Sequence, residues 1–489
     1  MSEAASVPFS ETKAPESPDR LNRGALGLVD ISASTMANIG PAYSFYFSAG
    51  FLFLTAGVAA PLTIIVAGVA IALLGNTLSQ FSRVHPSTGG FISYVGKTFG
   101  GTSAVTTALL CGAGYIIAIS SVLAICGGYL SMMLAYYFNV SIPWVLFSVV
   151  FTIGAMFMMY RGVAVSTKLA GFFFGFEMLV LVVVSIAALI KNGGHLSAVP
   201  FEPSHITNGF SGLAAGFPLA VYLFIGWENS AALAEETANP RRNVPRAVYL
   251  SIALMLVGYI LYAYATATGF KYNVTALNSA TIPFINVSHD VAGWLALIAW
   301  IAGLTSTLGV LISAVNSQAR LVFNAGREGL LPRWLGKVHP TRRTPVNAIY
   351  AFIAIATVII LVWALLHLTG GPKQSGGMNA LNYFVDSSTM GTILILVVYF
   401  LSNLALPFYY RKYRPQEFNV LKHAVLPVLG MIAVAVPMYY LVKPGQSAPL
   451  NWFPYAALGV IVVSVGYAFW LSRRDPGLGD RVGSIVADE

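Results

Sequence analysis

Residues 217–247, FPLAVYLFIGWENSAALAEETANPRRNVPRA, combine an apolar segment with a glycine, a tryptophan and a glutamate, and then end in a turn followed by three arginines. An apolar segment followed by arginines is typical of a membrane-spanning helix. Gly226 and Glu228 do not fit a plain anchor, because a loosened backbone or a charge in lipid costs several kcal/mol unless it lines a cavity or the protein interior. The stretch therefore predicts an interrupted membrane helix.

The composition of the whole chain supports a membrane protein. Of the 489 residues, 57% are hydrophobic and 9% are charged, whereas soluble domains have about 25% charged residues. The mean hydropathy is +0.73. A net charge of +9 could suggest a nucleic-acid partner, but the basic residues lie in short loops between apolar runs, which membrane topology explains better. We expect a polytopic protein surrounded by a lipid bilayer, with no nucleic-acid partner.

Twelve apolar runs are long enough to cross about 30 Å of hydrocarbon as helices. They predict an all-α fold with 12 transmembrane helices, at residues 28–54, 57–81, 98–134, 142–160, 166–190, 208–234, 247–270, 289–321, 346–369, 381–408, 423–442 and 453–471. The polar residues 1–27 predict a disordered N-terminal tail, and residues 472–489 a C-terminal tail.

Placed on alternate sides of these spans, all but four of the 27 Lys and Arg residues fall on one side. The exceptions are Lys191, Lys271, Lys373 and Lys443. Because such an excess marks the cytoplasmic side, we expect both termini in the cytoplasm and a multi-pass protein of the plasma (inner) membrane.

A second interruption is predicted in the first span, SASTMANIGPAYSFYF at residues 32–47. Pro41 removes a backbone donor and Gly40 lets the chain leave helical angles, so the helix is expected to break around Ile39–Ala42, with a simple proline kink as the alternative. Four spans separate this break from the one at Gly226. Breaks at corresponding places in two five-span halves of opposite orientation are typical of an inverted-repeat transporter, with its site where the breaks meet.

Three stretches resemble the amino acid-polyamine-organocation superfamily of secondary transporters, in its amino acid permease branch. They are GWENSAALAEETANPRRNVPRA at 226–247, NSQARLVFNAGREGLLPRWLGKVHPTRRTPVNA at 316–348, and IGPAYSFYF at 39–47 with PSTGGFISYVGKTFG at 86–100. The resemblance implies a LeuT-type 5+5 inverted repeat plus two C-terminal helices, with repeat 1 at 28–190, repeat 2 at 208–408, and helices 11 and 12 at 423–471. It also implies a substrate site between helices 1 and 6, with contributions from helices 3, 8 and 10.

The resemblance also implies which residues bind substrate. The family's first break usually reads Gly, small residue, Gly, whereas this chain has Gly40, Pro41 and Ala42. Pro41 has no amide hydrogen to donate. The backbone N–H groups of Ala42, Tyr43 and Ser44 are left as donors to the substrate carboxylate. Tyr222 matches the aromatic residue that closes over substrate in relatives. The predicted substrate-binding residues are Asn38, Ile39, Gly40, Pro41, Ala42, Tyr43, Ser44, Tyr222, Phe224, Ile225, Gly226 and Trp227.

Two intramembrane carboxylates are candidates for proton coupling. Counted from Arg161, Glu177 matches the helix 5 position where proton-coupled members carry a lysine, about 16 Å into its span. It is expected to exchange the driving proton, to sense a cationic substrate, or to form a structural hydrogen bond to helix 1 or 8. Glu228 is expected to link helix 6 to the core or to take part in proton sensing.

Sodium coupling is an alternative, because Thr305, Ser306, Thr307 and Ser313 on helix 8 carry hydroxyl oxygens, although such hydroxyls more often bond to their own backbone. No His, Cys, Asp and Glu set has metal-ligand spacing, and no nucleophile lies beside a recognisable base. We therefore expect neither an enzyme nor a cofactor.

The leading interpretation is a carrier that imports or exchanges amino acids or related amines by alternating access, coupled to protons. A sodium-coupled carrier, an obligate exchanger of polyamines or cationic amino acids, and a nutrient sensor built on the carrier fold are the alternatives. A channel would need a repeated filter or charged rings, and the sequence contains neither.

Overall fold

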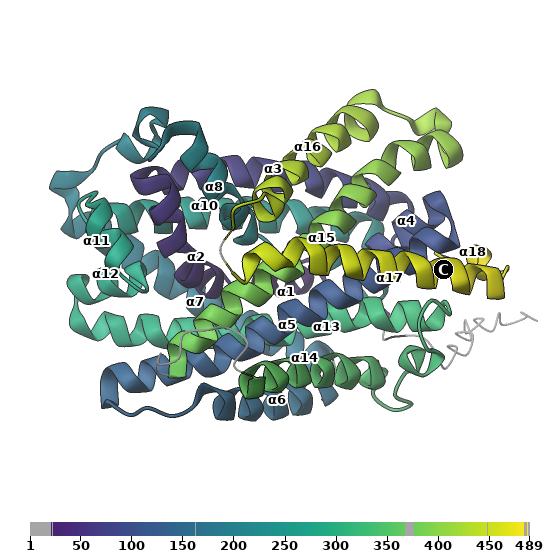
Figure 1. Ribbon diagram of the computed structural model, residues 1–489, viewed down its shortest axis with the longest axis horizontal. Coiled ribbons are helices and arrows are strands. Elements are labelled where there is room, and N and C mark those ends of the chain that lie inside the picture. Colours follow the sequence, from purple (N-terminus) through teal and green to yellow (C-terminus); the bar gives the residue numbers. More distant parts are fainter. Residues whose placement is uncertain are drawn as a thin grey trace, which may run out of the picture.

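The structure is a computed structural model that describes residues 21, 23–161, 163–366, 376–446, 448–483 and 487. This part of the chain is helical (Figure 1). The N-terminal half contains α1 (Leu28–Ile39), α2 (Pro41–Ala56), α3 (Ala60–Val84), α4 (Phe91–Phe99), α5 (Gly101–Phe138), α6 (Trp144–Tyr160), α7 (Val163–Lys191), α8 (Gly209–Tyr222) and α9 (Asn229–Ala232). The C-terminal half contains α10 (Pro240–Gly269), α11 (Val274–Ser279), α12 (Pro283–Val291), α13 (Gly293–Arg327), α14 (Val346–Leu366), α15 (Gly376–Tyr413), α16 (Leu426–Val442), α17 (Phe453–Arg474) and α18 (Leu478–Arg481).

Nine helices within the described residues are long and apolar enough to cross a membrane. The first of these, Leu28–Val84, has 57 residues and runs through two of the predicted spans. The shorter apolar helix α6 matches the fourth predicted span, and α8 covers the first part of the sixth. The all-helical membrane fold is thus confirmed, while the count of twelve spans and the assignment of residues 28–190 and 208–408 to two repeats stay predictions. Most of the predicted N-terminal tail, residues 1–20 and 22, lies outside the described residues.

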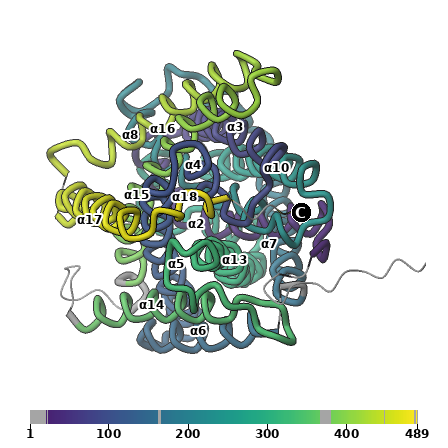
Figure 2. The backbone as a smooth tube through the Cα atoms, turned by 90° about the vertical axis from the view of Figure 1, so that its right-hand side faces the viewer, coloured from purple at the N-terminus to yellow at the C-terminus, as the bar shows by residue number. Residues whose placement is uncertain are grey.

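Long helices cross the centre of the molecule and hold the interrupted ones in place. Helix α5 packs against α13, α15, α6 and α17, and α13 packs against α7 and α1 (Figure 2). A second packed pair is formed by α3 and α10, and α1 lies against α10. The break between α1 and α2 is therefore surrounded by helices from both halves of the chain.

Buried ion pairs anchor the chain where it leaves the second break. Glu236 of the short 3-10 helix Ala234–Glu236 pairs with Arg320 of α13, and both side chains are fully buried. Its neighbour Glu235 pairs with Arg327 at 2.7 Å and also accepts the backbone N–H of Leu21 at 3.0 Å. These contacts fix the end of the interrupted helix against α13 and against the N-terminal segment.

The described C-terminal residues form a second anchor, which we call the C-terminal clasp (residues 478–483). Leu478 and Val482 are buried, and the N–H of Gly483 donates to the Glu328 Oε1 atom at 3.0 Å. Burial raises the pKa of Glu328 to about 7, and the hydrogen bond from Gly483 acts against this shift. The clasp joins the end of α17 to the loop after α13.

Candidate functional site

The first helix is interrupted at Gly40, as the sequence predicts. Helix α1 ends at Ile39, Gly40 has a left-handed φ of 62°, and α2 begins at Pro41. A left-handed glycine ends a helix readily because it has no Cβ, and proline is well suited to the first position of the next helix. A Cβ on Gly40 would lie 2.1 Å from the Val310 Cγ2 atom of α13. The break is therefore confirmed, and only glycine fits it.

The second break lies between Tyr222, the last residue of α8, and Asn229, the first of α9. Gly226 in this turn has a φ of 108°, and a Cβ there would lie 3.0 Å from the Asn38 Nδ2 atom. That same nitrogen donates to the Gly226 carbonyl oxygen at 3.4 Å. The two breaks therefore face each other in direct contact, as the inverted-repeat interpretation requires.

We expect Gly40→Ala to reduce transport at least tenfold, because the new methyl group both strains a left-handed residue and overlaps Val310. The measurement is uptake into vesicles, normalised to the amount of folded protein. Gly175→Ala on α7 is the matched control, since its Cβ meets nothing within 4 Å. Equal uptake by the two variants would contradict this account of the break.

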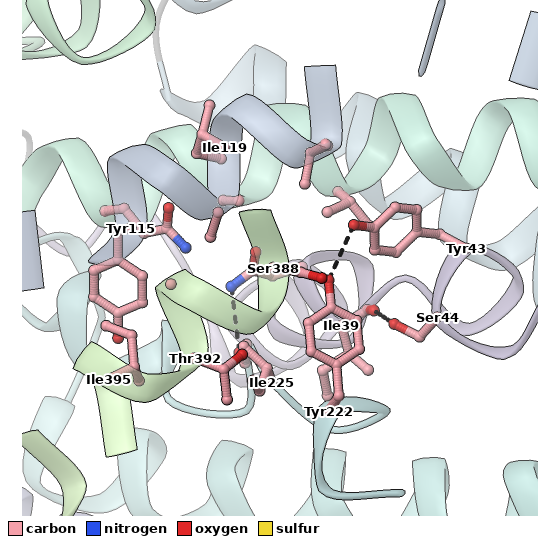
Figure 3. Close-up of a pocket in the computed structure, with 18 residues that line it drawn as sticks. Ile39, Tyr43, Ser44, Tyr115, Ile119, Tyr222, Ile225, Ser388, Thr392 and Ile395 are labelled. Carbon is pink, nitrogen blue, oxygen red and sulfur yellow. Dashed lines mark hydrogen bonds between the residues drawn. The ribbon is translucent and has the colours of Figure 1, made fainter. Parts of the chain in front are cut away.

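A cavity of about 50 Å³ lies beside the two breaks (Figure 3). Its lining combines backbone and side chains of both breaks with one face each of α5, α13 and α15: Asn38, Ile39, Tyr43, Ser44, Tyr115, Ala118, Ile119, Val122, Tyr222, Ile225, Gly226, Val310, Ala314, Gln318, Ser388, Gly391, Thr392 and Ile395. The helices are those that the family resemblance implies.

Seven of the predicted substrate-binding residues line this cavity, namely Asn38, Ile39, Tyr43, Ser44, Tyr222, Ile225 and Gly226. The other five, Gly40, Pro41, Ala42, Phe224 and Trp227, are not part of its lining. Phe224 is fully buried against Tyr259, with 5.4 Å between ring centroids, and Trp227 packs against Tyr399 at 5.7 Å. Contact of any of these residues with substrate stays a prediction.

The backbone donors predicted after the first break already have partners within the protein. The Ala42 N–H donates to the Glu177 Oε2 atom at 2.9 Å, and the Tyr43 N–H donates to the Ser306 Oγ atom at 2.9 Å. The Ser44 N–H donates to the Gly40 carbonyl oxygen at 2.7 Å. In this conformation the first turn of α2 is therefore held by α7 and α13, and these amides do not face the cavity unpaired.

The two carboxylates occupy different places around the breaks. Glu177 is fully buried and accepts a hydrogen bond from the start of α2. A hydrogen bond to helix 1 is one of the roles that the sequence predicts for Glu177. Glu228 accepts the Tyr115 hydroxyl at 2.8 Å and the Gly226 N–H at 3.2 Å. Glu228 thus links the second break to α5, as expected for a polar link from helix 6 to the core.

The hydroxyl cluster on α13 is largely used by the protein itself. Thr305 donates to the Ile301 carbonyl oxygen at 3.1 Å and Thr307 to the Leu304 carbonyl oxygen at 2.8 Å. The Ser306 oxygen accepts from Tyr43. Within the described residues, no group of three or more His, Cys, Asp or Glu could hold a metal ion. Thr305 and Thr307 thus follow the common pattern of hydroxyls bonded to their own helix, whereas the buried Ser313 hydroxyl has no partner among the described residues.

The wall of the cavity contains residues that the sequence analysis did not select. Tyr115 and Ile119 come from α5, Gln318 from α13, and Ser388 and Thr392 from α15. These helices are apolar on nearly all faces, so no periodic pattern indicates which residues point inward. The hydroxyl residues of the tenth predicted span are the one sequence feature that indicates cavity-lining positions, and hydroxyl residues also occur on packed helix faces.

An aromatic cluster covers one end of the cavity. The Tyr43 and Tyr222 hydroxyls lie 3.3 Å apart (Figure 3). The ring of Phe384 contacts both, at centroid distances of 5.5 Å and 5.8 Å. Aromatic residues of α2, α8 and α15 thus meet at the cavity.

A family model described as amino acid permease matches residues 26–465. The chain belongs to this family. Its members are carriers that work by alternating access, and they are not enzymes. The all-helical, LeuT-type fold class expected from the resemblance is thereby confirmed.

Individual relatives are distant but cover most of the permease. The chain is 22% identical over 435 residues to the branched-chain amino acid permease BcaP of Bacillus subtilis, covering 83% of this chain and 85% of that protein. It is 26% identical over 470 residues to the Asc-type amino acid transporter 1 of Mus musculus, covering 92% and 82%. A manganese transporter of Eremococcus coleocola, in complex with an aromatic bis-isothiourea substituted compound, has a similar fold, with a TM-score of 0.55, 12% identity, and coverage of 91% of this chain and 94% of that chain.

The permease contains a second, smaller cavity of about 20 Å³ next to the first. Asn38, Tyr115 and Gln318 line both spaces and so form the partition between them. Glu228 and Asn229 line the second cavity and not the first.

Proposed function

We propose that this permease imports or exchanges amino acids with uncharged side chains, and that they bind in the cavity beside the two breaks. One observation carries the proposal: none of the residues that line the cavity has a charged side chain. A cationic or acidic substrate side chain would be buried there without a counter-charge, which is costly. This favours neutral amino acids over the polyamines and cationic amino acids that the sequence leaves open.

The binding mode follows from what the cavity offers. The substrate ammonium and carboxylate groups are placed against the polar backbone of the breaks, near Ile39 and Gly226, with the Asn38 and Ser44 side chains beside them. The substrate side chain points toward Ile119, Thr392 and Ile395 of α5 and α15. Tyr222 closes the site together with Tyr43. The names of the branched-chain and Asc-type relatives are compatible with such a substrate.

We further propose that transport is coupled to protons through Glu177, with Glu228 in a scaffold role. The support is the position of the Glu177 carboxylate, which accepts the Ala42 N–H in the first turn of α2, directly after the break. The distribution of Lys and Arg supports an orientation with both termini in the cytoplasm and a location in the plasma (inner) membrane.

Counterflow in proteoliposomes tests the substrate proposal. Vesicles loaded with unlabelled leucine, serine, lysine, glutamate or putrescine are diluted into labelled leucine at a fixed pH. We expect leucine and serine inside to drive labelled uptake, and lysine, glutamate and putrescine to drive none. Counterflow driven by lysine or putrescine would overturn the neutral-substrate proposal, and saturable binding without any counterflow would indicate a sensor.

A substitution that fills the cavity ties this activity to the site. We expect Thr392→Trp to lower leucine counterflow at least tenfold, because an indole occupies much of the space that the substrate needs. Val462→Trp on α17, where the side chain is 61% exposed, is the matched control and should transport normally. If Thr392→Trp folds and transports like the control, the substrate binds elsewhere.

A further inference from the structure

A surface hollow that shares no lining residue with the substrate cavity has the features of an anion-binding site. It has a volume of about 620 Å³ between the end of α3 and the start of α10 and is lined by Arg83, Arg241, Arg242, Arg246, Tyr249 and Leu250, together with Pro245. Arg83 lies in the last turn of α3. The other arginines occupy the first two turns of α10. Four guanidinium groups from two helices therefore surround one space that no carboxylate lines.

Several arginines of the protein are paired with carboxylates, whereas three arginines of this hollow are not, within the described residues. Arg320, Arg327 and Arg414 form ion pairs with glutamates. Among the described residues, no carboxylate forms an ion pair with Arg83, Arg242 or Arg246. Like charges held together repel each other, and the planar guanidinium group fits the paired oxygens of phosphate and carboxylate groups. Because the hollow lies at the end of an apolar span, where lipid headgroups supply phosphate, we take the expected ligand to carry a phosphate group.

The surface below the arginines distinguishes a lipid from a soluble phosphate. On α10 the stripe that begins at Arg242 and Arg246 continues along the same face through Tyr249, Leu250, Leu254 and Val257. These four side chains are 39%, 42%, 45% and 67% exposed. A basic group at one end of a span, followed by an exposed apolar stripe, matches a charged headgroup followed by an acyl chain.

We propose that Arg83, Arg242 and Arg246 bind the phosphate headgroup of an anionic membrane lipid, whose acyl chain lies along the exposed face of α10. The site bridges α3 and α10, which pack against each other, and α10 also contacts α1. A bound lipid holds together the pair of helices that flanks the interrupted helix. The arginines lie on the side that we predict to be cytoplasmic.

The test uses the full chain in a neutral detergent and dansyl-labelled phosphatidylglycerol, with energy transfer from the protein's tryptophans as the readout. We expect the triple variant Arg83→Gln, Arg242→Gln, Arg246→Gln to bind about a hundredfold more weakly, because each arginine near an anionic headgroup contributes about fivefold. The matched control is Lys337→Gln, Arg411→Gln, Arg473→Gln. It removes three exposed basic residues from the same predicted side and should bind as the natural chain does.

Competition identifies the source of the phosphate. Unlabelled phosphatidylglycerol should displace the probe, whereas phosphatidylcholine and inorganic phosphate should not. Equal weakening in both triple variants would show a general charge effect and overturn the site, and displacement by inorganic phosphate would overturn the lipid assignment. If the triple variant is less thermally stable than the control, Arg246→Gln alone decides, with an expected weakening of about fivefold.

Discussion

Glu177→Gln is expected to reduce accumulation driven by a pH gradient at least tenfold, while counterflow of neutral amino acids continues. The carboxylate of Glu177 accepts the Ala42 N–H in the first turn of α2, where the helix dipole favours negative charge. A charge-assisted hydrogen bond is about twice as strong as a neutral one. Proton binding would therefore weaken the bond that joins α7 to the break, and glutamine fixes the neutral form permanently.

The measurement is uptake of labelled leucine into proteoliposomes with and without an inwardly directed proton gradient, each with sodium or potassium as the main cation. Glu177→Asp keeps the charge and should keep a response to the gradient. Glu228→Gln should also keep it, because Glu228 bonds Tyr115 and Gly226 and does not touch α2. An unchanged proton response in Glu177→Gln would remove Glu177 from the coupling mechanism, and a response to sodium in the natural chain would favour the sodium-coupled alternative.

Arg320→Met is expected to destabilise the protein by about 3–5 kcal/mol, because it leaves the Glu236 carboxylate buried without its partner. Both side chains are 0% exposed, and the Arg320 Nη2 and Glu236 Oε1 atoms lie 3.2 Å apart. The double variant Arg320→Met, Glu236→Gln removes both charges and should recover most of this loss, since replacing a buried pair by neutral groups is often close to neutral.

Thermal unfolding in detergent, followed by intrinsic tryptophan fluorescence, measures the effect as a shift in Tm. Arg414→Met is the matched control, because Arg414 pairs with Glu417 at the surface, where the side chains are 40% and 52% exposed. Such exposed pairs contribute about 0 to 1 kcal/mol. A Tm for Arg320→Met as high as that of the control would show that the pair does not anchor the second break.

The parts of the site that depend on local backbone chemistry could be predicted from the sequence. A Gly-Pro pair in an apolar span indicates a break because of the two residues' own conformational limits, and the structure places the break at Gly40. The second break is indicated by Gly226 and Glu228, because a glycine and a carboxylate do not suit a plain apolar span. The proximity of the two breaks followed from the repeat, and the hydrogen bond from Asn38 to Gly226 confirms it.

The remaining parts depend on how uniform apolar helices are rotated, and the sequence contains little information about that. Ile119 and Ser388 line the cavity, but their helices have apolar residues on nearly every face. The pairing of Ala42 with Glu177 joins residues that are 135 positions apart. A hydrogen bond between Glu177 and helix 1 is among the roles that the sequence allows, but no pattern within either segment indicates that the Ala42 amide is its donor, so the sequence assigns Ala42 to the substrate.

The C-terminal clasp bears on how the permease is produced and observed. Val482 is fully buried, and the Ala487 N–H donates to the Pro86 carbonyl oxygen at 2.9 Å, in the loop between α3 and α4. A fluorescent reporter or affinity tag joined to the chain just after Ala487 is therefore attached next to a docked backbone. Reporters placed there compete with this docking, so brightness in an expression screen and transport by the same fusion need not rise together.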